Sequence, residues 1–159
     1  MPPLLVLAVA ALVGPLSVSL PSGAINGMPV FGTTVTQVEA ALGPPSSVET
    51  YPDRRDLVYK GRIEVIFHGP AADQGAQTAW AVLVVDPNAT VTGLGRPLAV
   101  PPPTLERRLR ATGLRQERRY HCDVRGCFGT FFGAGGTRRI IFGLNRGGRY
   151  LGVQVWPNP

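Results

Sequence analysis

Glycine and proline interrupt this chain throughout, which limits it to short helices and strands joined by turns. The 159 residues include 20 glycines and 16 prolines, more than average usage, and these do not form a regular repeat. Because 44% of the residues are hydrophobic, a packed core is still expected. We therefore predict one domain, or two very small ones, built from many short elements without a long helix.

The first 24 residues carry no charged side chain and contain an apolar run from Leu4 to Val13. A membrane span needs about 20 apolar residues, so this shorter run is more typical of a signal peptide than of a span. A buried N-terminal helix is the alternative, and the lack of Lys or Arg before the run departs from the usual signal. We predict a signal peptide over residues 1–24, cleavage before Ile25, and a secreted or periplasmic protein with no transmembrane span in its mature chain.

The two cysteines, Cys122 and Cys127, flank a four-residue segment that contains a turn-forming Asp and Gly. Outside the cytosol such thiols are usually oxidised, and cysteines on either side of a hairpin loop can come within bonding distance. Redox or metal use is the alternative, but zinc needs four ligands and only His121 lies beside the pair. We predict a disulfide-closed hairpin, and no metal or cofactor.

A short helix followed by strands occurs twice, in residues 25–90 and again in residues 91–159. An apolar-x-Gly-apolar segment precedes each helix, and a glycine, Gly43 or Gly113, ends it. In the first helix, Thr36 followed by Glu39 predicts a capping box. In the second, Leu105 and Leu109 are expected to face inward.

Alternating apolar and polar residues predict antiparallel strands after each helix. Residues 63–68 place Ile, Val and Phe on one face of a strand, and residues 78–87 are apolar on both faces. In the last strand, Leu151, Val153 and Val155 should share a face opposite Gly152, Gln154 and Trp156. The predicted fold is α+β: after the signal peptide come two related units, each a short helix followed by an antiparallel β-meander.

The segment "GTTVTQVEAALGPP" (residues 32–45), followed by "LVYKGRIEVIF" (residues 57–67), resembles the SmpA/BamE-like envelope proteins and the β-lactamase-inhibitor-protein fold. This resemblance implies a small exported α+β module that binds another protein through one sheet face or its loops. The second unit departs from the pattern, since it is proline-rich before the helix and arginine-rich within it. No cysteine lies near the signal cleavage point for a lipid anchor, and no functional residue is carried over.

The charge of the chain is divided unevenly between the two units. Residues 25–90 carry four basic and seven acidic side chains, a net charge of −3, whereas residues 91–159 carry twelve arginines and three acids, a net charge of +9. Such a field attracts nucleic acid, anionic lipid or an acidic protein face. The candidate binding residues lie around the second helix: Arg107, Arg108, Arg110, Arg115, Arg118 and Arg119.

We expect a non-catalytic binding protein whose arginine-rich second unit engages an envelope or extracellular protein, or an anionic polymer or lipid surface. A solvated basic face without a partner is the plainer interpretation. One alternative is a small secreted hydrolase that pairs His68 or His121 with Asp56 or Asp123. Another is a DNA-binding envelope factor, although the chain carries no recognition motif for nucleic acid.

Overall fold

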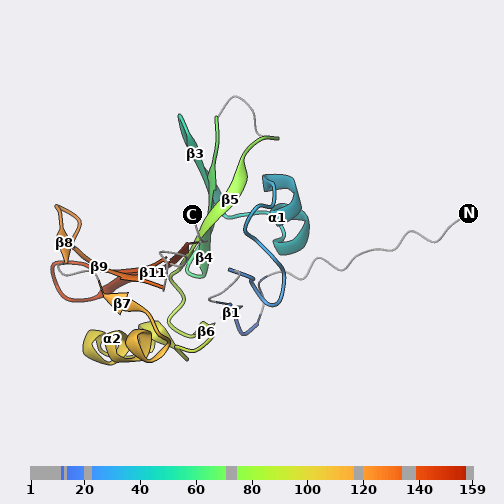
Figure 1. Cartoon of the computed structure of the whole chain (residues 1–159). Helices are drawn as coiled ribbons and strands as arrows, with labels where there is room; N and C mark the ends of the chain where they lie inside the picture. Colours follow the sequence, from blue (N-terminus) through green and yellow to red (C-terminus); the bar gives the residue numbers. More distant parts are fainter. Residues whose placement is uncertain are drawn as a thin grey trace, which may run out of the picture.

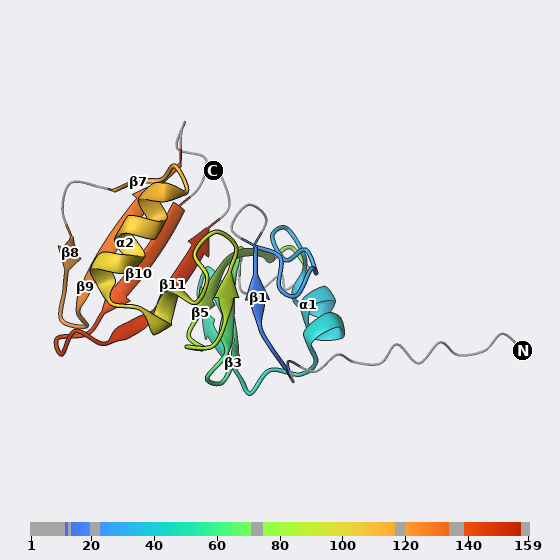
Figure 2. The ribbon, with the colours of Figure 1, turned by 90° about the horizontal axis from the view of Figure 1, so that it is seen from below.

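The computed structural model describes residues 12, 14–19, 23–70, 75–116, 120–133 and 139–156. Over these residues the chain forms two short α-helices and one large antiparallel sheet, which confirms the α+β class. The sheet bends sharply between its two halves (Figure 1). Both helices, α1 (Val35–Leu42) and α2 (Pro102–Ala111), lie on the outer side of the bend, and the inner side carries neither of them (Figures 1 and 2).

The strands of the large sheet come in two consecutive groups. The first group is β2 (Ser47–Tyr51), β3 (Arg54–Tyr59), β4 (Ile63–His68) and β5 (Thr78–Val84). The second group is β7 (Arg115–Gln116), β8 (His121–Cys122), β9 (Cys127–Phe132), β10 (Arg139–Leu144) and β11 (Tyr150–Trp156). Within the described residues the strand order is β2-β3-β4-β5-β11-β10-β9-β7, and β8 also pairs with β9. The last strands of the two groups therefore pair with each other, β5 against β11.

Helix α1 begins two residues earlier than the sequence predicts. Its N-cap is Thr34, whose hydroxyl accepts from the backbone N–H of Gln37, while the Gln37 side chain accepts from the Thr34 N–H. The predicted capping box of Thr36 and Glu39 is therefore wrong. Backbone hydrogen bonds hold residues 32–34 against the start of β5, and this tertiary pairing fixes where the helix can begin.

The second helix ends just before Gly113, as predicted. A short 3-10 helix, η1 (Pro97–Ala99), leads into it, and Pro102 occupies its first turn, where a missing N–H costs nothing. Leu105 and Leu109 are fully buried, as predicted. Gly113 follows the helix with a φ of 85°, a left-handed conformation that a glycine adopts without strain.

A short N-terminal strand, β1 (Ser17–Val18), pairs in parallel with β6 (Thr90–Val91). The Thr90 N–H donates to the Leu16 carbonyl at 2.9 Å, and Leu16 and Val18 are each 1% exposed. The predicted signal peptide lies partly outside the described residues. Its described part, residues 12, 14–19 and 23–24, includes chain that is packed into the fold.

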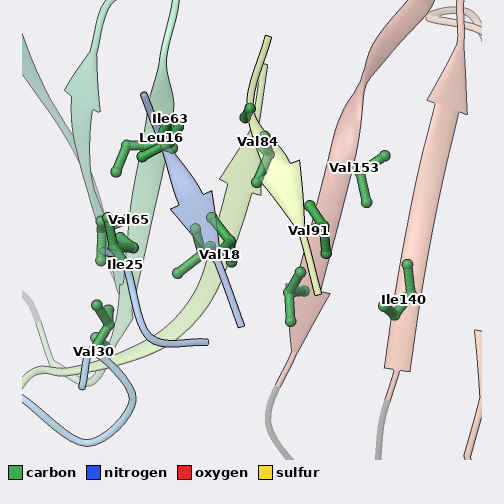
Figure 3. Close-up of a cluster of buried hydrophobic side chains, with 14 of the residues drawn as sticks. Leu16, Val18, Ile25, Val30, Ile63, Val65, Val84, Val91, Ile140 and Val153 are labelled. Atoms are coloured by element: carbon green, nitrogen blue, oxygen red, sulfur yellow. The ribbon is translucent and has the colours of Figure 1, made fainter. Parts of the chain in front are cut away.

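The core is continuous across the line where the two groups of strands meet. In Figure 3, Val91 of β6 lies between Val84 and Val153, and Val18 of the neighbouring β1 lies on the side toward Val65. All four side chains are at most 1% exposed. The β1–β6 pair therefore covers the junction between the two groups on the outer side of the bend (Figure 2).

Candidate functional site

The inner side of the bent sheet carries a groove of about 600 Å³. It crosses β3, β4, β5, β11, β10 and the start of β9, on the face opposite the helices. Most of its lining is apolar or aromatic, with charged side chains toward its two ends. The side chains that line it are Asp53, Arg54, Ile66, His68, Trp80, Leu83, Arg125, Phe128, Ile141, Leu151, Gln154 and Trp156, together with Gly143 and Gly152.

Three rings form an aromatic cluster at the β4–β5–β11 end of the groove. The centroids of His68 and Trp80 are 4.3 Å apart, and those of Trp80 and Trp156 are 3.9 Å apart, both in edge-to-face arrangements. Both indoles are half-buried, so each keeps part of its surface open to the groove. Partly exposed tryptophans in a concave site supply large apolar area with little loss of side-chain freedom on binding.

Two β-bulges place large apolar side chains in the groove. One lies between β4 and β5, where Ile66 pairs with Ala81 and Phe67 with Ala79, so that Trp80 is the extra residue. The other lies between β10 and β11, where Leu151 is the extra residue. The prediction that Leu151 shares a face with Val153 is therefore wrong, because the bulge turns it toward the groove.

Glycines form the floor of the groove at its β10–β11 end. Gly143 and Gly152 lie opposite each other in register, and neighbouring side chains lie over them. A Cβ on Gly143 would lie 2.8 Å from the ring of Phe128, and one on Gly152 would lie 2.7 Å from Leu83. Larger residues at these two positions would fill the hollow.

The two arginines in the groove are each bound to a carboxylate of the chain. Arg54 donates through Nε to Oδ1 of Asp56 at 2.7 Å, and Asp56 is 1% exposed. Arg125, at the other end, pairs with Asp123 at 3.0 Å. The backbone N–H and guanidinium of Arg125 hold the pKa of Asp123 below its ordinary value.

The structure places the predicted arginine cluster on the opposite side of the molecule from the groove. Arg107 and Arg115 are exposed, while Arg108 donates to the Leu94 carbonyl at 2.7 Å. Arg110 bonds to Gln116 and lies 3.8 Å from Glu106. Arg118 and Arg119 lie outside the described residues. Four of the six predicted binding residues therefore belong to α2 and its exit, and two of those four have partners within the chain.

The histidine–carboxylate pairs considered from the sequence are not brought together. His68 lies in the groove against Trp80, while Asp56 is bound by Arg54. His121 is exposed on the β8–β9 hairpin, and Asp123 is bound by Arg125. Among the described residues, no cluster of three or more His, Cys, Asp and Glu side chains could hold a metal ion.

The disulfide between Cys122 and Cys127 is present, as predicted. The two residues lie opposite each other in the β8–β9 hairpin, with their Cα atoms 4.1 Å apart. The Asp123 carboxylate accepts from the backbone N–H of Arg125 at 2.7 Å and of Gly126 at 3.3 Å. These bonds shape the turn independently of the sulfur atoms.

Because the disulfide closes so short a loop, replacing both cysteines by serine should lower the free energy of unfolding by only about 2 kcal/mol. Urea unfolding of the double variant, with the reduced natural chain as control, measures this loss. A loss of more than about 4 kcal/mol, well above the chain-entropy value, would mean that the hairpin supports the whole sheet. An unchanged unfolding midpoint would mean that the bond makes no contribution in solution.

Sequence reasoning located the two tryptophans in strands but not in a site. The signal that could have found them is a large aromatic residue in each of the two strands that end their groups, both turned to the face without helices.

Among the described residues, no helix is long and apolar enough to cross a membrane. Comparison with protein-family models, with curated proteins and with solved structures finds no match for this chain.

Proposed function

We propose that this chain is an exported, non-catalytic protein-binding module that holds a segment of another protein in the groove on the inner side of its sheet. The observation that carries the proposal is the aromatic cluster of His68, Trp80 and Trp156 in a hollow of about 600 Å³. Tryptophans are among the residues most enriched in the energetic hot spots of protein interfaces, and here they lie in a concave site.

The groove supports protein binding better than the arginine cluster of the second unit does. Arg108 and Arg110 are engaged within the chain, and Arg107 and Arg115, which are exposed, do not line the groove. Solvent-exposed charges of this kind contribute little to affinity on their own. We therefore assign binding to the groove and keep the arginine cluster as the alternative surface.

We also propose that the two groups of strands, each with its helix, are copies of one unit. Three features support the repeat: each helix precedes strands of the same sheet, the sheet order of the second group mirrors that of the first, and the copies meet at their last strands. The segments aligned from the sequence form similar tight turns, in which Met28 donates to Ile25 and Leu94 donates to Val91, each at 2.9 Å. A groove between two copies is a natural place for a ligand.

Export remains part of the proposal. A disulfide is typical of oxidising compartments, and the apolar N-terminal segment is typical of a signal. The described residues of this segment extend the folded chain upstream of Ile25, so we place the start of the mature protein before Gly14.

The proposal is tested by capture from envelope extract with the purified exported protein, followed by mass spectrometry. Three proteins are compared: the natural chain, a Trp80→Ala/Trp156→Ala variant and an Arg107→Ser/Arg110→Ser variant. We expect one captured protein to be retained by the arginine variant and lost by the indole variant, with affinity reduced by about 30-fold or more. Urea unfolding of both variants checks that they remain folded.

The opposite pattern would contradict this assignment. If the partner is lost with Arg107→Ser/Arg110→Ser and retained by the indole variant, the binding surface is on α2. If all three proteins capture the same material, neither surface determines binding.

A further inference from the structure

We infer that the groove selects a protruding loop of a partner protein that carries a lysine or arginine next to an apolar side chain. This inference rests on the proposed function and adds the chemistry of the partner. It is argued from the shape of the groove, the pairing of its strands and the charges along its border.

The shape of the groove favours a loop over an extended strand or a flat surface. Strands β4, β5, β11 and β10 are each paired on both sides, so their backbone groups are already used and cannot accept an added strand. Recognition there depends on side chains that enter the hollow. A second copy that presents the same concave face would leave the hollow unfilled, whereas a convex loop fills it.

The border of the groove on the first group of strands is acidic. We call Glu49, Asp53, Asp56 and Glu64 the acidic border; they lie on β2, β3, β4 and the β2–β3 turn. Glu64 is two residues from Ile66 on β4 and opposite Leu83 on β5, both of which line the groove. Among the described residues of the first group of strands, Arg54 is the arginine that lines the groove. Of the four carboxylates of the acidic border, Asp56 is the one to which the guanidinium of Arg54 is bonded.

The pKa of Glu64 reflects both its partial burial and its acidic neighbours. Its pKa lies above the ordinary value of 4.5, first because of partial burial and then because of the nearby carboxylates Asp56 and Glu49. Arg54 lowers it by a smaller amount. A cation brought by a partner to this border would be attracted by the negative charge that the chain itself leaves uncompensated.

The aromatic cluster suits the same partner. The face of an indole attracts a lysine or arginine positioned within about 6 Å of its centroid, and the same face packs against aliphatic groups.

The chain as a whole has a net charge of +6. At physiological ionic strength, charges more than about 8 Å away are largely screened, so the charges beside the groove act on a docked side chain more strongly than the net charge of the chain does.

The test is selection from a phage library of disulfide-constrained loops with seven randomised positions. The full-length exported protein is the target, in parallel with an Asp53→Asn/Glu64→Gln variant and with Arg107→Ser/Arg110→Ser as the matched control. We expect the natural chain to enrich loops with Lys or Arg beside an aromatic or aliphatic residue. Synthetic copies of those loops should bind the Asp53→Asn/Glu64→Gln variant about tenfold more weakly and the arginine control equally well.

A second measurement separates binding from stability. Ionised Glu64 is unfavourable in the folded chain because its folded pKa is raised, so Glu64→Gln should unfold at a higher temperature than the natural chain at pH 7. The difference should shrink as the pH falls below the raised pKa and vanish below the ordinary value of 4.5, since protonated glutamate resembles glutamine. If Glu64 affected only the stability of the fold, the more stable Glu64→Gln variant would bind the loops as tightly as the natural chain does.

Three outcomes would overturn the inference. The first is enrichment of Asp or Glu in the selected loops. The second is retention of Lys and Arg loops by Asp53→Asn/Glu64→Gln at unchanged affinity. The third is the absence of any loop whose binding depends on Trp80 and Trp156. If neutral loops bind in the groove as tightly as basic ones, the charge preference is wrong, while the proposed protein-binding function stands.

Discussion

A chain that begins at Ile25 is expected to lose most of its stability, whereas a chain that begins at Gly14 is expected to keep it. The residues between these two starts include Leu16 and Val18, which are each 1% exposed and belong to the hydrophobic core. Removing two such side chains from the core costs about 3–6 kcal/mol. That is comparable to the whole stability of a small domain, about 5–15 kcal/mol.

Urea unfolding of the two chains, residues 14–159 and residues 25–159, measures this difference directly. The shorter chain also loses the bonds that the backbone N–H groups of Thr90 and Thr92 donate to the carbonyls of Leu16 and Val18. Tertiary structure can be followed by near-ultraviolet circular dichroism, because both indoles lie in the sheet. Equal unfolding midpoints for the two chains would show that β1 does not contribute to the fold.

The second large effect is expected at the junction between β5 and β11, where Gly152→Ala should lower the free energy of unfolding by about 2–4 kcal/mol. Gly152 has a φ of 150°, which favours glycine. An added Cβ would lie 2.9 Å from the Val84 carbonyl oxygen and 2.7 Å from Leu83 Cδ1. The backbone of β5 would have to move, and with it the pairing that joins the two groups of strands.

Gly148→Ala provides the matched control for this substitution. Gly148 also has a positive φ, 74°, but an added Cβ would meet no atom within 4 Å. Its replacement should cost only the backbone strain, about 1–2 kcal/mol. A Gly152→Ala variant no less stable than Gly148→Ala would mean that the β5–β11 approach is looser than the structure shows.

Local sequence patterns predicted the elements of this fold but not their exact edges. The buried positions Leu105 and Leu109, the glycine ends of both helices and the disulfide follow from periodicity and spacing. The start of α1 does not, because pairing of residues 32–34 with β5 decides it. The boundary at Ile25 rests on signal-peptide patterns, which contain no information about whether Leu16 is buried in the core, as it is in the structure.

The groove could not be predicted because it depends on two bulges. Alternation assigns each residue of a strand to a face, and one extra residue reverses that assignment locally. Trp80 and Leu151 are the extra residues in their strands, and both line the groove. The charge asymmetry along the chain pointed instead to the arginines of α2, which lie on the covered side of the sheet.

The central claim, that a partner occupies the groove, is tested most directly by intrinsic fluorescence. The chain contains two tryptophans, Trp80 and Trp156, and both line the groove. Titration with a selected loop that lacks tryptophan should shift their emission to shorter wavelength and protect them from acrylamide quenching. Saturable binding of that loop with unchanged emission and unchanged quenching would place the partner elsewhere on the molecule.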